Sequence, residues 1–214
     1  MYLSSSGNTY RRGDPIAFTD GYLFMIPSFF CLLPAIPIAI WIVRRGADDR
    51  WTLFAMLALV HVTAVVALTI FPIPIGGQDF YRQTRGMSGD NVVPFATIVS
   101  QLQHLSLSTV RQLGGHILAL TPLGVYGPEL WPALRDWRRF VIVAMAVGVG
   151  IELAQYAGSV MEGFSYRITD VDDAIMNATG AVAAFFVWRW LSRGRLAAIL
   201  AALGLESPSW LAKP

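Results

Sequence analysis

Long apolar runs with few charged residues alternate with polar connections along most of this chain. A helix needs about 20 apolar residues to cross the hydrocarbon core of a bilayer, and several runs approach or exceed that length. The runs cover residues 22–43, 51–73, 112–126, 140–160 and 171–191. The pattern therefore predicts an all-α integral membrane protein built as a five-helix transmembrane bundle.

The connection between the second and third predicted helices is much longer than the others and is rich in glycine. It contains the segment Asn91-Val-Val-Pro94-Phe95. We expect this long external loop to re-enter the membrane or to lie over a pocket in the bundle.

The ends of the chain differ from the bundle at residues 22–191. Residues 1–21 form a polar segment with two arginines, unlike the basic-then-apolar layout of a cleaved signal peptide, so we expect the first membrane segment to be retained. Residues 192–214 form a tail whose apolar part, 196–205, is too short to span a bilayer. We expect the tail to lie in the cytoplasm or at the membrane interface.

Composition supports the membrane interpretation. Of the 214 residues, 55% are hydrophobic and only 14% are charged, whereas soluble domains carry roughly 25% charged residues. No basic run with interleaved aromatic residues is present, which argues against a nucleic-acid partner. The single cysteine, Cys31, excludes an internal disulfide and a cysteine-based zinc site.

Arginine placement orients the predicted bundle, because cytoplasmic loops are enriched in Lys and Arg. Arginines gather in the first connection, in the third connection and after the last helix: Arg44, Arg45, Arg50, Arg135, Arg138, Arg139, Arg189, Arg193 and Arg195. Fewer lie on the other side: Arg11, Arg12, Arg82, Arg85, Arg111 and Arg167. We therefore expect the N-terminus outside and the C-terminus inside the cell.

The start of the last predicted helix carries the most informative polar pattern. Asp170, Asp173, Asn177 and Gly180 are three, four and three residues apart, so they share one face of a helix. Capping of the helix N-terminus would account for Asp170. It accounts poorly for Asn177, two turns inside, and ionisable or polar residues at membrane depth indicate function.

In the predicted topology the unusual polar residues all fall in the outer half of the bundle, where they would line one pocket. These candidate ligand-binding residues are Asn91, Arg111, Gln112, His116, Glu152, Gln155, Arg167, Asp170, Asp173 and Asn177. Simple packing roles stay open for His116 and Gln155. A buried Glu152 needs an arginine, a shared proton or water, and Arg167 and Arg111 are the external cations available.

Other chemistries find little support. Glu152, Asp170, Asp172, Asp173 and His116 could supply oxygen and nitrogen ligands, but no metal-ligand spacing accompanies them, so we expect no metal and no cofactor. The chain has no serine in a nucleophile-elbow context and no phosphate-binding glycine loop.

Four motifs in order resemble the VanZ-like family of bacterial membrane proteins. They are Asn91-x-x-Pro94-Phe95, the stretch from Gly115 to Pro122-Leu-Gly124, Glu152-x-x-Gln155, and Arg167-x-x-Asp170-x-x-Asp173-x-x-x-Asn177-x-x-Gly180. The family pattern Asn-x-x-Gly-Asn-Ile differs here, because Gln112 and His116 occupy the two asparagine positions.

The resemblance implies a multi-pass protein of the bacterial plasma membrane, in a family linked through its founding member to resistance against teicoplanin, a lipoglycopeptide. The partner would be a membrane lipid or a lipid-linked cell-surface ligand, such as a cell-wall precursor, a phospholipid head group or a lipoglycopeptide. Arg167 and Arg111 would meet an anionic head group. Two alternatives stay open: an intramembrane enzyme using Glu152 or Asp173 as acid or base, and a structural or partner-binding subunit.

Overall fold

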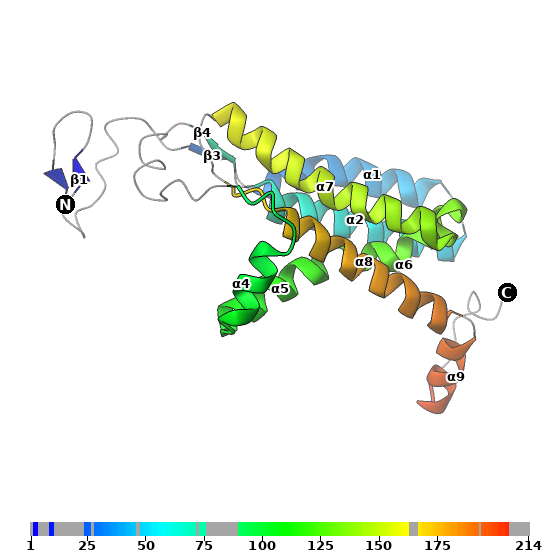
Figure 1. Ribbon diagram of the computed structural model, residues 1–214. Helices are drawn as coiled ribbons and strands as arrows, with labels where there is room; N and C mark the ends of the chain where they lie inside the picture. The colour runs from blue at the N-terminus through cyan, green and yellow to red at the C-terminus, as the bar shows by residue number, and fades with distance from the viewer. Residues whose placement is uncertain are drawn as a thin grey trace.

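The computed structural model describes residues 28–45, 48–71, 90–162, 167–192 and 194–205, together with the backbone of four two- or three-residue strands (Figure 1). These are β1 Tyr2–Leu3, β2 Thr9–Tyr10, β3 Phe24–Ile26 and β4 Ile73–Ile75. Strand β1 pairs antiparallel with β2, and β3 pairs antiparallel with β4. The rest of the described chain is mainly helical.

The helices follow one another along the chain in this order. They are η1 Ser28–Cys31, α1 Leu32–Arg44, α2 Asp49–Thr69, α4 Ala96–Gln103, α5 Leu107–Ala119, α6 Thr121–Leu130, η2 Pro132–Arg135, α7 Trp137–Glu162, α8 Val171–Leu191 and α9 Arg195–Ala202. Within the described ranges, α2, α7 and α8 are long and apolar enough to cross a membrane.

These three helices confirm the predicted segments 51–73, 140–160 and 171–191. The predicted segment 22–43 corresponds to η1 and to α1, which has 13 residues. A helix of that length rises about 20 Å, less than the apolar core of a bilayer. The total of five spans therefore stays a prediction.

The predicted single helix over 112–126 is wrong, because the structure divides it at Leu120 into α5 and α6. Pro122 lies in the first turn of α6. Proline has no backbone N–H and its ring clashes with the carbonyl four residues earlier, so one continuous helix cannot pass through this point without distortion.

The break leaves helix-end carbonyls that need donors, and α2 supplies one. His61 Nε2 lies 2.6 Å from the Ala119 carbonyl oxygen, and His61 Nδ1 lies 3.0 Å from the Tyr126 hydroxyl. With its proton on Nε2, the imidazole donates to the carbonyl and accepts from the hydroxyl. His61 therefore joins α2 to both α5 and α6 where they separate.

Helix α8 lies at the centre of the bundle and packs against α5, α6 and α7 (Figure 1). Its Phe185 stacks on Phe140 of α7 with ring centroids 4.6 Å apart. Small residues let the backbones approach closely: a Cβ on Gly180 would overlap the Ile117 carbonyl of α5, and one on Gly124 would overlap the α8 backbone. Such close contacts replace the hydrophobic driving force that is missing between helices in lipid.

One end of the bundle gathers the described arginines from the predicted cytoplasmic connections. Arg50 Nη2 lies 2.7 Å from Glu129 Oε2, and the Trp188 indole N–H donates to Glu129 Oε1 at 2.8 Å. Arg189 donates to the Arg135 carbonyl at 3.0 Å. The start of α2 and the ends of α6 and α8 therefore share this end, as the topology requires, and its cytoplasmic orientation stays a prediction.

The described part of the predicted long loop contains a helical hairpin rather than an irregular chain. Helices α4 and α5, here called the α4–α5 arm, project sideways from the bundle beside the N-terminal half of α8 (Figure 1). The chain carries no Asp, Glu, Lys or Arg from Asn91 to Val110. Large apolar side chains of this stretch are exposed: Val92, Val93, Phe95, Val99, Leu102, Leu105, Leu107 and Val110.

Replacing Gly180 by alanine should destabilise the protein by about 1–3 kcal/mol, because the added methyl group must push the α5 backbone away from α8. Gly150→Ala is the matched control on a neighbouring helix, since a Cβ there meets nothing within 4 Å. Thermal unfolding of the detergent-purified proteins measures the difference. Equal unfolding temperatures for the two variants would contradict the close approach of α5 and α8.

Single cysteines test the orientation of the bundle in a Cys31→Ser background. A cysteine at Asp48 or Asp136 should resist an impermeant thiol reagent on intact cells, whereas one at the exposed Ile168 should react. The expectation follows from the arginine bias. The reverse labelling pattern would invert the topology.

Candidate functional site

Asp170 organises the start of α8. Its Oδ1 accepts from the Asp172 backbone N–H at 2.9 Å and from the Asn91 side-chain amide at 2.8 Å, while the Thr97 hydroxyl donates to Oδ2 at 2.6 Å. The Asn91 and Asp170 backbones form an isolated parallel bridge. Asp170 is therefore the N-cap of α8 and also fixes the chain that leads into α4.

Asp172 has no solvent exposure and caps a different helix, α4. Its carboxylate accepts from the backbone N–H groups of Phe95, Thr97 (2.8 Å) and Ile98 (3.1 Å). Phe95, the N-cap of α4, adopts a left-handed backbone with φ 68° and offers no side-chain acceptor. The carboxylate supplies the acceptors that the first turn of a helix needs.

Sequence reasoning did not single out Asp172 as a contact for the arm. The available signal was the helix start Pro94-Phe95-Ala96, which has no Ser, Thr, Asp or Asn to cap it. A helix without its own cap needs an acceptor from elsewhere in the fold. Nothing in the spacing identified which carboxylate would provide it.

Glu152 of α7 is 5% exposed, and its Oε2 accepts from the Asp170 backbone N–H at 3.1 Å. The expected partner, Arg167, instead donates from Nη2 to the carbonyls of Leu68 (3.2 Å) and Phe71 (2.9 Å) at the end of α2. The last carbonyls of a helix have no intrahelical donors, which explains this use of the guanidinium. Among the described residues, Arg167 forms no ion pair with Glu152 or Asp173.

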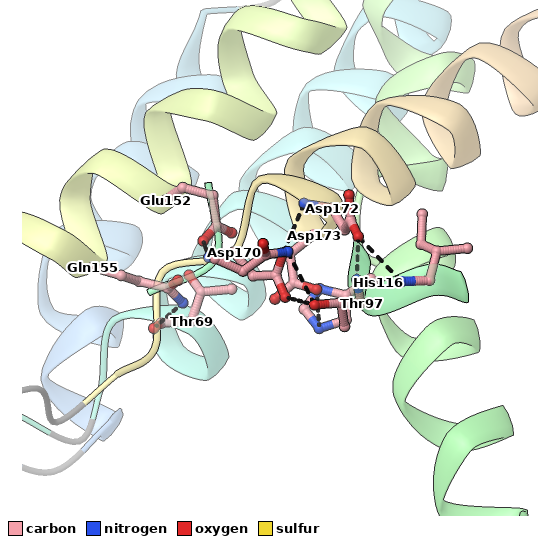
Figure 2. A network of polar contacts seen from close by, with 10 residues as sticks. Thr69, Thr97, His116, Glu152, Gln155, Asp170, Asp172 and Asp173 are labelled. Atoms are coloured by element: carbon pink, nitrogen blue, oxygen red, sulfur yellow. Dashed lines mark hydrogen bonds and ion pairs between the residues drawn. The ribbon is translucent and has the colours of Figure 1, made fainter. Parts of the chain in front are cut away.

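Gln155, one turn beyond Glu152 on α7, donates from Nε2 to the Thr69 carbonyl at 2.9 Å (Figure 2). This contact also satisfies the end of α2 and holds α2 against α7. The interhelical packing role considered for Gln155 is therefore present in the structure.

Asp173, His116 and Asn177 form the least satisfied part of the cluster. His116 Nε2 of α5 lies 3.4 Å from Asp173 Oδ1, and the two side chains point toward each other (Figure 2). Asp173 Oδ1 and Asn177 Oδ1 are both buried and accept no hydrogen bond from the described residues. Asn177 is only 2% exposed.

The predicted stripe on α8 agrees with these contacts. Asp173 meets His116 and Gly180 abuts Ile117, both on α5. Asn177 lies between them in sequence, but around the helix it is rotated about 40° from Asp173, away from Gly180 and toward the side where Ala174 abuts Gly148 of α7. It therefore lies at the edge of the face turned toward α5. We call the junction between the arm and α8, lined by His116, Asp173 and Asn177, the fork.

The other two candidates on α5 are exposed and lie outside this network. Gln112 is one turn before His116 on the same face, and Arg111 is rotated about 140° away from His116. The structure thus brings together Asn91, His116, Glu152, Asp170 and Asp173, as shown by the contacts above. Arg111 and Gln112 take no part in those contacts.

The cluster is rich in carboxylates and poor in cations. The N-terminal dipoles of α8 and α4 offset Asp170 and Asp172, which sit at those helix ends. Asp173 meets only the His116 imidazole, and Glu152 meets a backbone N–H. Among the described residues no group of three or more His, Cys, Asp or Glu side chains is arranged to hold a metal ion.

Asp172→Asn should destabilise the protein by about 2–4 kcal/mol, because an amide turns one acceptor into a donor facing backbone N–H groups. Hydrogen exchange at Phe95, Thr97 and Ile98 should accelerate in this variant. Asp173→Asn is the matched control one residue away and should leave exchange in α4 unchanged. Equal protection of α4 in both variants would show that Asp172 does not hold the arm.

Comparison with known proteins places the cluster in a family. Neither a curated protein nor a solved structure shows significant similarity to this chain. The family model described as VanZ/LLP1 matches residues 57–192, from α2 to the end of α8. That region covers more than half of the chain and contains every residue of the cluster, so the protein belongs to the VanZ/LLP1 family.

Proposed function

We propose that this protein is a multi-pass protein of the bacterial plasma membrane that binds the polar head group of an amphipathic ligand at the fork. The observation that carries the proposal is the pair of buried oxygens, Asp173 Oδ1 and Asn177 Oδ1, that accept no hydrogen bond from the described residues. Buried polar atoms are nearly always paired, and each exception calls for a missing partner. A ligand that donates hydrogen bonds would supply that partner.

The position of the fork favours a ligand that comes from the membrane. The chain from Asn91 to Val110, which forms α4 and the start of α5, carries no Asp, Glu, Lys or Arg and exposes apolar side chains beside α8, itself long and apolar enough to span a bilayer. Acyl chains would cover the apolar surface while the head group reaches His116 and Asp173. Asp173 retains 14% exposure and His116 31%, so both side chains are partly accessible.

Membrane lipids, lipid-linked cell-wall precursors and lipoglycopeptides all combine an apolar tail with a polar head. A role in resistance to teicoplanin-type antibiotics would follow if the ligand were the lipoglycopeptide or its lipid-linked target. The proposal does not require that role, because any of these amphipathic molecules could occupy the same site.

A second candidate function is an intramembrane enzyme, favoured by the contact between His116 Nε2 and Asp173 Oδ1. An imidazole oriented by a carboxylate is a common general acid or base. In this version the fork would bind the same class of ligand, and His116 would exchange a proton with its head group. Glu152 is less suited, because its Oε2 is occupied by the Asp170 N–H.

Lipid analysis of the purified protein tests the binding function. The parent chain, isolated in mild detergent, should retain a lipid that Asp173→Asn and Asn177→Leu lose by about tenfold, the effect of one charge-assisted hydrogen bond. Asp49→Asn, the same change at an exposed position at the far end of α2, should retain it.

Identical retained lipids in all four proteins would remove the ligand site and favour a structural cluster. A retained lipid that differs in chemical form between the parent and Asp173→Asn would favour the enzyme over the binder. Gel filtration confirms that each variant is folded before its lipids are compared.

A further inference from the structure

Carboxylate and carbonyl oxygens dominate the groups at the fork, and these hydrogen-bond acceptors constrain the ligand. Helix α8 contributes Asp173 and Asn177, α5 contributes His116, and Glu152 of α7 lies nearby through Asp170. We propose that the head group bound at the fork carries a primary ammonium group. This inference rests on the proposed binding function and names the chemistry of the ligand.

The first argument is charge. Asp170 and Asp172 accept hydrogen bonds from backbone N–H groups at helix N-termini, whereas Asp173, also in the first turn of α8, has the His116 imidazole as its ion-pair partner among the described residues. Arg167 is engaged with the carbonyls of α2, and Arg111 is rotated away from the fork. A carboxylate in apolar surroundings is costly without a compensating charge, and a cationic head group would provide it.

The number of hydrogen-bond donors on the head group also matters, independently of its charge. Asp173 and Asn177 are one turn apart, about 6 Å along the axis of α8. A tetrahedral nitrogen that makes two hydrogen bonds of about 2.9 Å spans acceptors up to about 5 Å apart, so one nitrogen bridges the two oxygens when their side chains lean toward each other. A primary ammonium has three N–H donors, a hydroxyl has one, and a quaternary ammonium has none.

Asn177 makes this count decisive. Its side chain is 2% exposed, uncharged and on the same stripe as Asp173, yet its carbonyl oxygen accepts nothing from the described residues. Charge attraction alone would leave that oxygen unsatisfied. A ligand that satisfies both positions needs at least two donors, and a positive charge favours the contact with the Asp173 carboxylate.

The inference replaces the expected anionic head group. That expectation depended on Arg167 and Arg111 meeting the head group, and the structure uses Arg167 to satisfy the end of α2. A bare phosphate at the fork would instead face Asp173 and the carbonyl oxygen of Asn177, both acceptors. The phosphate of a phospholipid would lie outside the fork, nearer the water.

Four lipids with the same dioleoyl chains separate charge from donor count. Phosphatidylethanolamine has positive charge and donors, phosphatidylcholine has positive charge without donors, phosphatidylglycerol has donors without positive charge, and phosphatidic acid lacks an amine and a polyol. Delipidated full-length protein is incubated with an equimolar mixture, re-isolated and analysed by native mass spectrometry.

We expect phosphatidylethanolamine to exceed each other lipid by about tenfold in the parent and in Asp49→Asn. The preference should disappear in Asp173→Asn. It should fall in Asn177→Leu, which also serves if Asp173→Asn does not fold. The preference of the parent protein for phosphatidylethanolamine over the other three lipids tests the ammonium proposal without any variant.

The outcomes distinguish a failure of the ammonium proposal from a failure of the proposed binding function. Equal binding of phosphatidylcholine would show that charge suffices, and equal or stronger binding of phosphatidylglycerol or phosphatidic acid would show that no ammonium is needed. If the lipid binding in either case still depends on Asp173, the primary ammonium group is ruled out as the ligand's head group. The proposed binding function is then retained. Lipid binding that ignores both Asp173 and Asn177, or no binding in the parent, overturns both.

Discussion

One fully buried carboxylate, Asp172, holds together the two parts of the structure that define the fork. Its carboxylate accepts hydrogen bonds from three backbone N–H groups at the start of α4, while its own backbone belongs to the first turn of α8. Burying a charge is favourable only when hydrogen bonds replace water, and the helix end offers donors of the right polarity. Together with the hydrogen bond from Thr97 to Asp170 and the close approach of Ile117 to Gly180, this contact sets the position of the arm beside Asp173 and His116.

The cluster therefore contains two kinds of polar residue. Asp170, Asp172, Gln155 and Arg167 satisfy helix ends and are accounted for by the fold itself. Asp173 and Asn177 keep buried oxygens that the fold does not satisfy. Structural demands explain the first set completely, so any ligand chemistry has to be carried by the second set together with His116.

The sequence predicted the elements that depend on local pattern. Helices α2, α7 and α8 follow from apolar length, and the stripe through Asp173 and Gly180 follows from helical periodicity. It failed where a tertiary partner decides the outcome. Pro122 signals the break at Leu120, but the apolar run around it also fits one helix. Arg167 binds helix-end carbonyls, which compete with carboxylates for the same donors.

The contact between Asp172 and α4 has a consequence for assembly in the membrane. Asp172 follows Phe95 by 77 residues, so α4 and the whole arm are synthesised well before their cap exists. Until α8 is inserted, the first N–H groups of α4 need water as a partner, which keeps the start of the arm at the membrane surface. Docking of the arm must therefore be a late step, completed only when the last long apolar helix of the described chain arrives and brings the missing acceptor.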